Sequence, residues 1–163
     1  TDLLITDRAT WMTTKSAGLK KVDKSTFELL IGDYLTQPWP EYAHTSLLEL
    51  APGKLLIGMR NKGLAQLDAS GLTIYNTTNS MLPSNEIRCL EKANDGSVWI
   101  GTFTGLVHFQ DGSFITYTTS NSVLPDDNIR VIREDQNGSI WVGTETGGLV
   151  KFEGDNGTKY DRD

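Results

Sequence analysis

The segment DQNGSIWVGTETGGLVKF at residues 135–152 is the strongest indication of the fold, because a close copy, NDGSVWIGTFTGLVHF, precedes it at residues 94–109. The tryptophans of the two copies, Trp99 and Trp141, are 42 residues apart. Self-similarity at a fixed period of this length is typical of proteins built from repeated structural units.

The repeat extends over the rest of the chain. The segments that lead into the two copies also match, and they read YNTTNSMLPSNEIR at 75–88 and YTTSNSVLPDDNIR at 117–130. Two weaker copies are PGKLLIGMRNKGLAQL at 52–67 and RATWMTTKSAGLKKV at 8–22. The Trp position therefore occurs four times at a period of 42–45 residues, as Trp11, Leu56, Trp99 and Trp141.

Each unit has the pattern of short strands joined by turns. In the last unit, Ile129 to Glu134 is rich in β-branched residues, and Asn137-Gly138 follows as a hairpin turn in which both residues are expected at positive φ. Further strands are predicted over 139–143, 148–152 and 158–160. Four antiparallel strands in about 42 residues form one blade of a β-propeller. The chain is predicted to be all-β, a single propeller region with blades at 1–36, 37–80, 81–122 and 123–163.

The glycine-rich segment GTETGG at 143–148 is similar at first sight to a phosphate-binding loop. Such a loop lies between a strand and the N-terminus of a helix and ends in Gly-Lys-Ser/Thr, whereas here another strand follows and that ending is absent. The glycines are therefore assigned to tight turns between strands, and the tryptophans to the space between neighbouring blades.

Composition excludes several classes of partner. The net charge of −6 leaves no basic stripe for nucleic acid. No run of about 18 apolar residues is present to span a membrane. The single cysteine, Cys89, allows no disulfide framework or cysteine-rich zinc site, and no motif for a cofactor or a metal is present. The chain begins Thr1-Asp2 without Met, which is typical of an excised domain.

The copies LPSNEIRCLEKANDGSVWIGTFTGLVHF and LPDDNIRVIREDQNGSIWVGTETGGLVKF resemble the two-component regulator propeller repeat. That family is typical of periplasmic sensor regions of bacterial hybrid histidine kinases and of related secreted proteins. The resemblance implies a periplasmic or extracellular location, a role in signal transduction, and a carbohydrate or other small molecule as ligand.

The family's sensors carry rings of seven blades, whereas this chain holds about four. Three arrangements remain open: a slice of a longer propeller, a closed four-bladed ring, or half of a dimeric eight-bladed ring. An open arc exposes apolar blade faces, which favours further blades or a homodimer.

Ligands of propellers usually bind the rim formed by the turns between the second and third strands together with the linkers between blades. Residues that break the repeat on this rim are candidate ligand contacts, and four of them vary in charge and size: Arg60, Asn61, Phe103 and Glu145. Phe103 suggests stacking against a sugar or another ring. The alternative for each is a solvated loop tip.

Two arginines and two histidines are further candidates. Arg88 and Arg130 share one repeat position, where they either meet an anionic ligand or tie linkers together by hydrogen bonds. His44 lies in an irregular segment near the rim, with Glu41 close in sequence but no second histidine, so it is a weak candidate for a site like that of the virginiamycin lyases. His108 is expected on the exposed side of a third strand.

The sequence thus predicts a non-enzymatic binding or sensor module, with an adhesive surface propeller and a lyase-like enzyme as alternatives.

Overall fold

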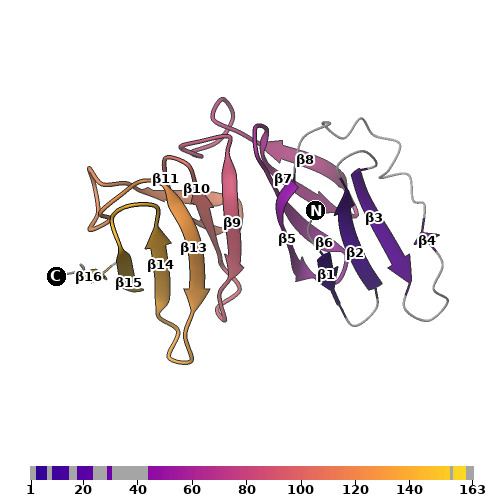
Figure 1. Cartoon of the computed structure of the whole chain (residues 1–163). Helices are drawn as coiled ribbons and strands as arrows, with labels where there is room; N and C mark the ends of the chain where they lie inside the picture. The colour runs from indigo at the N-terminus through magenta and orange to yellow at the C-terminus, as the bar shows by residue number, and fades with distance from the viewer. Residues whose placement is uncertain are drawn as a thin grey trace.

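The computed structural model describes residues 3–6, 9–14, 18–23, 29–30, 44–154 and 156–160. These residues form four antiparallel four-stranded sheets, and no helix occurs in the described ranges (Figure 1). Within each sheet, the strands lie side by side in chain order. The predicted all-β fold of propeller blades is confirmed.

The sixteen strands are shared equally among the four sheets, which we number in chain order. Sheet 1 consists of β1 (Leu3–Ile5), β2 (Ala9–Thr14), β3 (Gly18–Asp23) and β4 (Leu29–Leu30). Sheet 2 consists of β5 (His44–Ala51), β6 (Lys54–Met59), β7 (Gly63–Asp68) and β8 (Gly71–Tyr75). Sheet 3 consists of β9 (Ile87–Lys92), β10 (Val98–Thr102), β11 (Gly105–Gln110) and β12 (Ser113–Tyr117). Sheet 4 consists of β13 (Ile129–Glu134), β14 (Ile140–Thr144), β15 (Leu149–Glu153) and β16 (Asn156–Tyr160).

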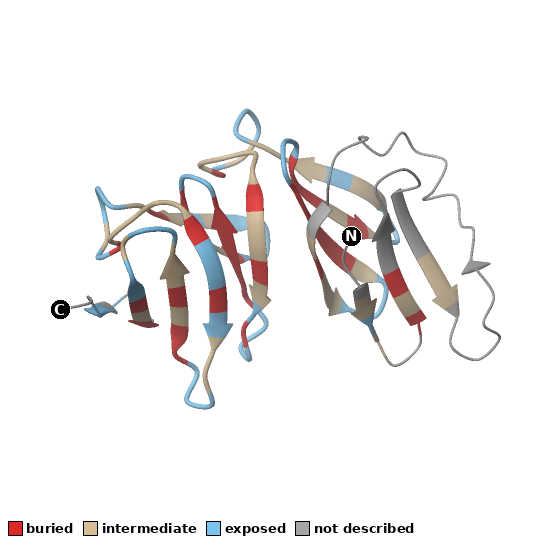
Figure 2. Cartoon of the chain, in the orientation of Figure 1, coloured by how far each residue is buried: buried red, intermediate tan, exposed pale blue. Residues whose placement is uncertain are grey.

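The burial of each strand follows from its place in the row of sheets. In sheet 3, every residue of β10 is buried, because this strand is covered on both faces, and its sequence VWIGT is accordingly apolar with one glycine. The outer strand β12 alternates between exposed and more buried residues, as a strand with one solvated face does. Figure 2 shows the buried positions concentrated in the inner strands and the exposed ones in the turns and in β16.

The hydrophobic core lies between sheets rather than inside any one of them. Buried side chains form three clusters, and each cluster is built from two successive sheets. Between sheets 3 and 4, for example, Trp99 lies 5.9 Å from Phe152 and 5.8 Å from Tyr117, measured between ring centroids. The predicted role of Trp99, to fill the space between neighbouring blades, is confirmed.

The hairpin between β13 and β14 differs from the prediction. Gly138 has φ of 81°, whereas Asn137 does not have positive φ. The amide of Gly138 donates to the Asp135 carbonyl at 3.1 Å, and the amide of Asp135 donates to the Ser139 carbonyl at 2.9 Å. The hairpin loop therefore has three residues, 136–138, and only the last of them, Gly138, needs a left-handed backbone.

The glycines of the repeat also have two separate roles. Gly148, with φ of 92°, lies directly before β15 at the end of the turn, and Gly105, with φ of 150°, is the first residue of β11. Gly101 and Gly143 instead lie inside strands β10 and β14, away from any turn. A Cβ atom on Gly101 would lie 2.7 Å from the Cγ2 atom of Ile129 in the next sheet. Close packing with neighbouring side chains, and not a tight turn, therefore requires glycine at these two positions; for Gly143 this agrees with the strand predicted over 139–143.

Candidate functional site

The turns between second and third strands lie beside the linkers between sheets, and backbone hydrogen bonds join the two. The amide of Phe103 donates to the Glu86 carbonyl at 3.1 Å, and the amide of Glu145 donates to the Asn128 carbonyl at 2.8 Å. The amide of Gly63 in sheet 2 donates to the Asn85 carbonyl at 2.8 Å. Turns and linkers thus form one rim, as the repeat predicts.

Side chains fix the linkers themselves in the same way in two successive copies. The Asn79 carboxamide accepts from the Asn76 amide at 2.8 Å, and the corresponding Asn121 accepts from the Thr118 amide at 2.7 Å. In the second linker, Asp127 accepts from the Thr119 amide at 2.6 Å. The linkers of the rim are therefore held by the same pattern of side-chain hydrogen bonds in both copies.

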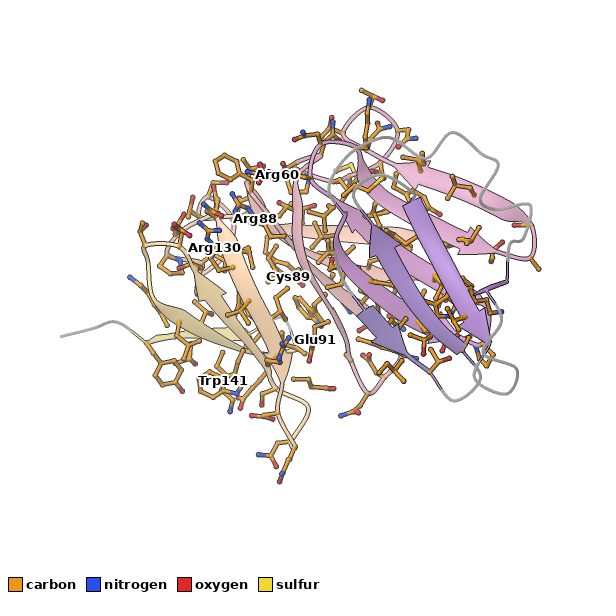
Figure 3. All side chains as sticks on the ribbon, turned by 45° about the vertical axis from the view of Figure 1, so that its right-hand side comes forward. Arg60, Arg88, Cys89, Glu91, Arg130 and Trp141 are labelled. Atoms are coloured by element: carbon orange, nitrogen blue, oxygen red, sulfur yellow. The ribbon has the colours of Figure 1, made fainter. Side chains whose placement is uncertain are left out.

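Three arginines project along this rim (Figure 3). The Nη2 atom of Arg88 lies 3.1 Å from Oε1 of Glu86, and the Nε atom of Arg60 lies 3.9 Å from the same oxygen. Arg60 belongs to the turn after β6, so Glu86 bridges sheets 2 and 3. In sheet 4, Arg130 pairs with Glu145. The three guanidinium groups of the rim thus lie beside the carboxylates of Glu86 and Glu145.

The two arginine–glutamate pairs are built differently from the same repeat. In sheet 3, the carboxylate comes from the linker as Glu86, and the turn carries Phe103. In sheet 4, the carboxylate comes from the turn as Glu145, and the linker carries Asn128. Each arginine therefore has a glutamate beside it, from the linker in one copy and from the turn in the other. The position that does not carry the glutamate holds a different side chain, Phe103 in sheet 3 and Asn128 in sheet 4.

Phe103 holds the turn position in sheet 3. Its side chain is 46% exposed, although it is a large apolar residue. The guanidinium carbon of Arg88 lies 5.2 Å from the centroid of the ring, which is a cation–π distance. Arg88 therefore supports one side of Phe103, while the exposed part of the ring is open to a partner.

The structure places the remaining predicted residues as follows. Asn61 is exposed in the turn beside Arg60. His44 is the first residue of β5, where it pairs with Met59, so it does not belong to an irregular segment as predicted. The side chain of His44 and the whole of Glu41 lie outside the described residues. Glu86 was missed, although a signal existed: it breaks the repeat, because Asn128 holds the same position in the next copy.

The prediction that His108 lies on the exposed side of its strand is wrong. Its ring stacks on Trp99 with 4.6 Å between centroids and 18° between planes, and its Nε2 atom is buried without a hydrogen-bond partner. The register explains the contact, because His108 lies directly opposite Trp99 on the neighbouring strand. Lys21 lies over Trp11 in the same way, at 4.8 Å from its centroid. A third-strand side chain that covers the tryptophan is thus part of the blade.

No group of three or more His, Cys, Asp and Glu side chains is arranged to hold a metal ion within the described ranges. No helix long and apolar enough to cross a membrane was found in the same part of the chain.

The chain was compared with known proteins. Residues 81–104 and 123–146 match the family model described as two component regulator propeller. No curated protein matched the chain. A solved structure with 24% identity and a TM-score of 0.70 is the extracellular domain of a protein named as the hybrid two component system BT3049 from B. thetaiotaomicron, where the match covers 96% of this chain and 22% of that one.

Two further structures are similar. The extracellular domain of BT4673 from B. thetaiotaomicron, named as a one component system, is 22% identical with a TM-score of 0.72, over 92% of this chain and 20% of that one. Virginiamycin B lyase from Staphylococcus aureus is 15% identical with a TM-score of 0.66, over 93% and 54%. This chain spans about a fifth of the length of the two B. thetaiotaomicron domains. The chain is thus a β-propeller polypeptide in which residues 81–104 and 123–146 match the two component regulator propeller repeat.

Proposed function

We infer that the chain is a non-enzymatic ligand-binding part of an extracytoplasmic sensor of a bacterial two-component system. The matched repeat and the likeness to extracellular domains from B. thetaiotaomicron support this role. The ligand is a small molecule, with a carbohydrate as the leading class. The proposed binding surface is the rim of Arg60, Asn61, Glu86, Arg88, Phe103, Arg130 and Glu145, to which His44 is a further candidate.

The exposed Phe103 ring carries the proposal. A buried phenylalanine would need no explanation, but this one is 46% exposed and is held by Arg88 on a rim that is otherwise charged. An aromatic face beside guanidinium donors suits a sugar ring, because the ring stacks on the apolar face while hydroxyl or carboxylate oxygens accept hydrogen bonds from arginine.

An array of neutral and acidic oligosaccharides, followed by calorimetry on the hits, tests this role. We expect at least one glycan to bind the wild-type chain and Phe103→Ala to weaken that binding by about tenfold, equal to about 1.4 kcal/mol. Ile115→Ala is the matched control, since Ile115 is 52% exposed on β12 and lies outside the rim. Binding that survives Phe103→Ala, or an array without hits, would contradict the proposal.

Arg88→Gln tests the charged part of the rim separately. For an acidic glycan, we expect weaker binding and a smaller dependence on salt, because one guanidinium partner is lost. For a neutral glycan, the salt dependence stays the same. Turnover of a streptogramin B antibiotic by the chain would instead favour the lyase-like alternative, given the similarity in fold to the lyases.

A further inference from the structure

One position of the repeat differs among the four sheets in a way that changes the space between blades. The second strands carry Trp11, Trp99 and Trp141, whereas sheet 2 carries Leu56. The strand register shows that these residues correspond, because each lies opposite the same position of its third strand. The four pairs are Trp11–Lys21, Leu56–Gln66, Trp99–His108 and Trp141–Lys151.

Between sheets 3 and 4, the indole of Trp99 fills a defined place. It stacks on His108, and it contacts Tyr117 and Phe152 with 5.8 and 5.9 Å between ring centroids. Trp99 is only 5% exposed, so this place is nearly closed to solvent. The side chains of His108, Tyr117 and Phe152 thus surround the position of the indole.

Between sheets 2 and 3, the corresponding three side chains line a cavity. Gln66 stands in the place of His108, Tyr75 in that of Tyr117, and Phe109 in that of Phe152. All three line a cavity of about 520 Å³, together with Leu50, Lys54, Val98 and Gln110. We call it the Leu56 cavity after the residue that replaces the tryptophan; Leu56 itself is fully buried, and the cavity is lined by Gln66, the residue opposite it. Where the tryptophan is present, between sheets 1 and 2, Trp11 itself forms part of the wall of a cavity of about 400 Å³.

The Leu56 cavity lies at the opposite end of the blades from the rim. Its walls include Ala51 at the β5–β6 turn, Gly96 at the β9–β10 turn and Gly112 at the β11–β12 turn. The rim is formed by the turns between second and third strands instead. The two surfaces are therefore separate, and a ligand in the cavity does not compete with one on the rim.

We propose that the Leu56 cavity binds a planar aromatic molecule of the size of indole, which takes the place of the tryptophan side chain that sheet 2 lacks. Tyr75 and Phe109, whose centroids are 6.0 Å apart, supply aromatic walls. Gln66 donates through Nε2 to Asp68 at 3.0 Å, which leaves its amide oxygen as an acceptor for a ring N–H. Lys54 adds a cation at the wall.

Indole is the probe, measured by calorimetry and by the shift in unfolding temperature, with cyclohexanol as a non-planar comparator. We expect indole to bind the wild type and raise its unfolding temperature, and cyclohexanol to bind at least tenfold more weakly. Leu56→Trp places an indole in the cavity covalently, so it should lose indole binding by more than tenfold. Leu149→Trp is the matched control, because the same change is made on β15, where Leu149 is 37% exposed and far along the chain from the cavity.

A second measurement keeps the proposal testable if Leu56→Trp does not fold. In the wild type, bound indole should shift the NMR signals of the Gln66 side-chain amide and the Tyr75 ring, and leave those of Trp141 unchanged. No indole binding by the wild type, equal binding by Leu56→Trp, or shifts confined to residues outside the cavity would overturn the proposal.

Discussion

At the residue scale, the glycines two positions after Trp99 and Trp141 show how closely neighbouring side chains approach the strands. A Cβ atom on Gly101 would lie 2.5 Å from Sγ of Cys89 and 2.7 Å from Cγ2 of Ile129, and Ile129 is fully buried. On Gly143, the corresponding atom would meet Cγ1 of Val131 at 2.7 Å, but Val131 is 44% exposed and has room to move. The same motif is therefore under different constraint in sheets 3 and 4.

We expect Gly101→Ala to lower the free energy of unfolding by about 1–3 kcal/mol, because the added methyl group overpacks the interface between sheets 3 and 4. Gly143→Ala is the matched control and should cost clearly less. Urea unfolding followed by tryptophan fluorescence measures both. Equal losses for the two variants would show that the strand itself, and not the neighbouring sheet, requires glycine.

Cys89 belongs to the same interface. Burial raises the pKa of its thiol to about 12, so the thiolate that reacts with disulfide reagents is nearly absent at neutral pH. We expect Cys89 in the folded chain to react with a thiol reagent at pH 8 far more slowly than in the urea-unfolded chain. Equal rates in the two states would contradict the buried position.

At the element scale, the linkers position the turns of the rim. Asp126 accepts hydrogen bonds from the Asn128 amide at 3.0 Å and from the amide and hydroxyl of Thr146, both at 2.8 Å. It thereby joins the linker before β13 to the turn after β14. In the previous copy, Ser84 holds the position and accepts from the Glu86 amide at 3.0 Å.

These hydrogen bonds lower the pKa of Asp126, first through the amide of Asn128 and then through Thr146. A carboxylate whose pKa is lower in the folded state stabilises the fold above its unfolded pKa of about 3.9, and this stability is lost as the pH falls through the folded value. We expect Asp126→Ser, which copies sheet 3, to be less stable than the wild type by about 1 kcal/mol at pH 7. The difference should shrink as the pH falls below about 4. Urea unfolding at several pH values measures it, and a difference that is independent of pH would contradict the role of the charge.

At the scale of the whole molecule, the sheets form a row in which sheets 1 and 4 lie at opposite ends (Figure 1). On sheet 4, Trp141 and Tyr160 lie 5.4 Å apart between centroids, in the places that Trp99 and Tyr117 hold in sheet 3. Tyr117 is 8% exposed beneath sheet 4, whereas Tyr160 is 46% exposed. The outer face of sheet 4 thus has the composition of an interface between blades.

The interpretation as part of a larger ring, completed by further blades or by a second copy, stays a prediction. The isolated chain should self-associate through the outer face of sheet 4, because Val131, Leu149 and Tyr160 add exposed apolar area around Trp141. Light scattering should give a mass above that of one chain, and the double variant Trp141→Lys, Tyr160→Lys should restore the monomer. Ile115→Lys on β12 is the control and should leave the mass unchanged. A wild-type monomer at all concentrations would contradict this prediction.

The number, order and strand content of the blades follow from the sequence alone, since a Trp or Leu, a Gly and a turn that recur every 42–45 residues report local structure directly. It also placed Phe103 and Glu145 on one rim, because residues at corresponding repeat positions fall on corresponding turns.

Only the tertiary structure decided what each of these residues contacts. Glu86 pairs with Arg88 and approaches Arg60 across two sheets, His108 stacks on Trp99, and Gly101 is required by Ile129 of the next sheet. Such contacts depend on how one blade packs on the next, and a repeat specifies the blade but not the side chain that its neighbour brings. For the same reason, the replacement of a tryptophan by Leu56 could be seen in the sequence, whereas the cavity beside it depends on Tyr75 and on Phe109 of the following blade.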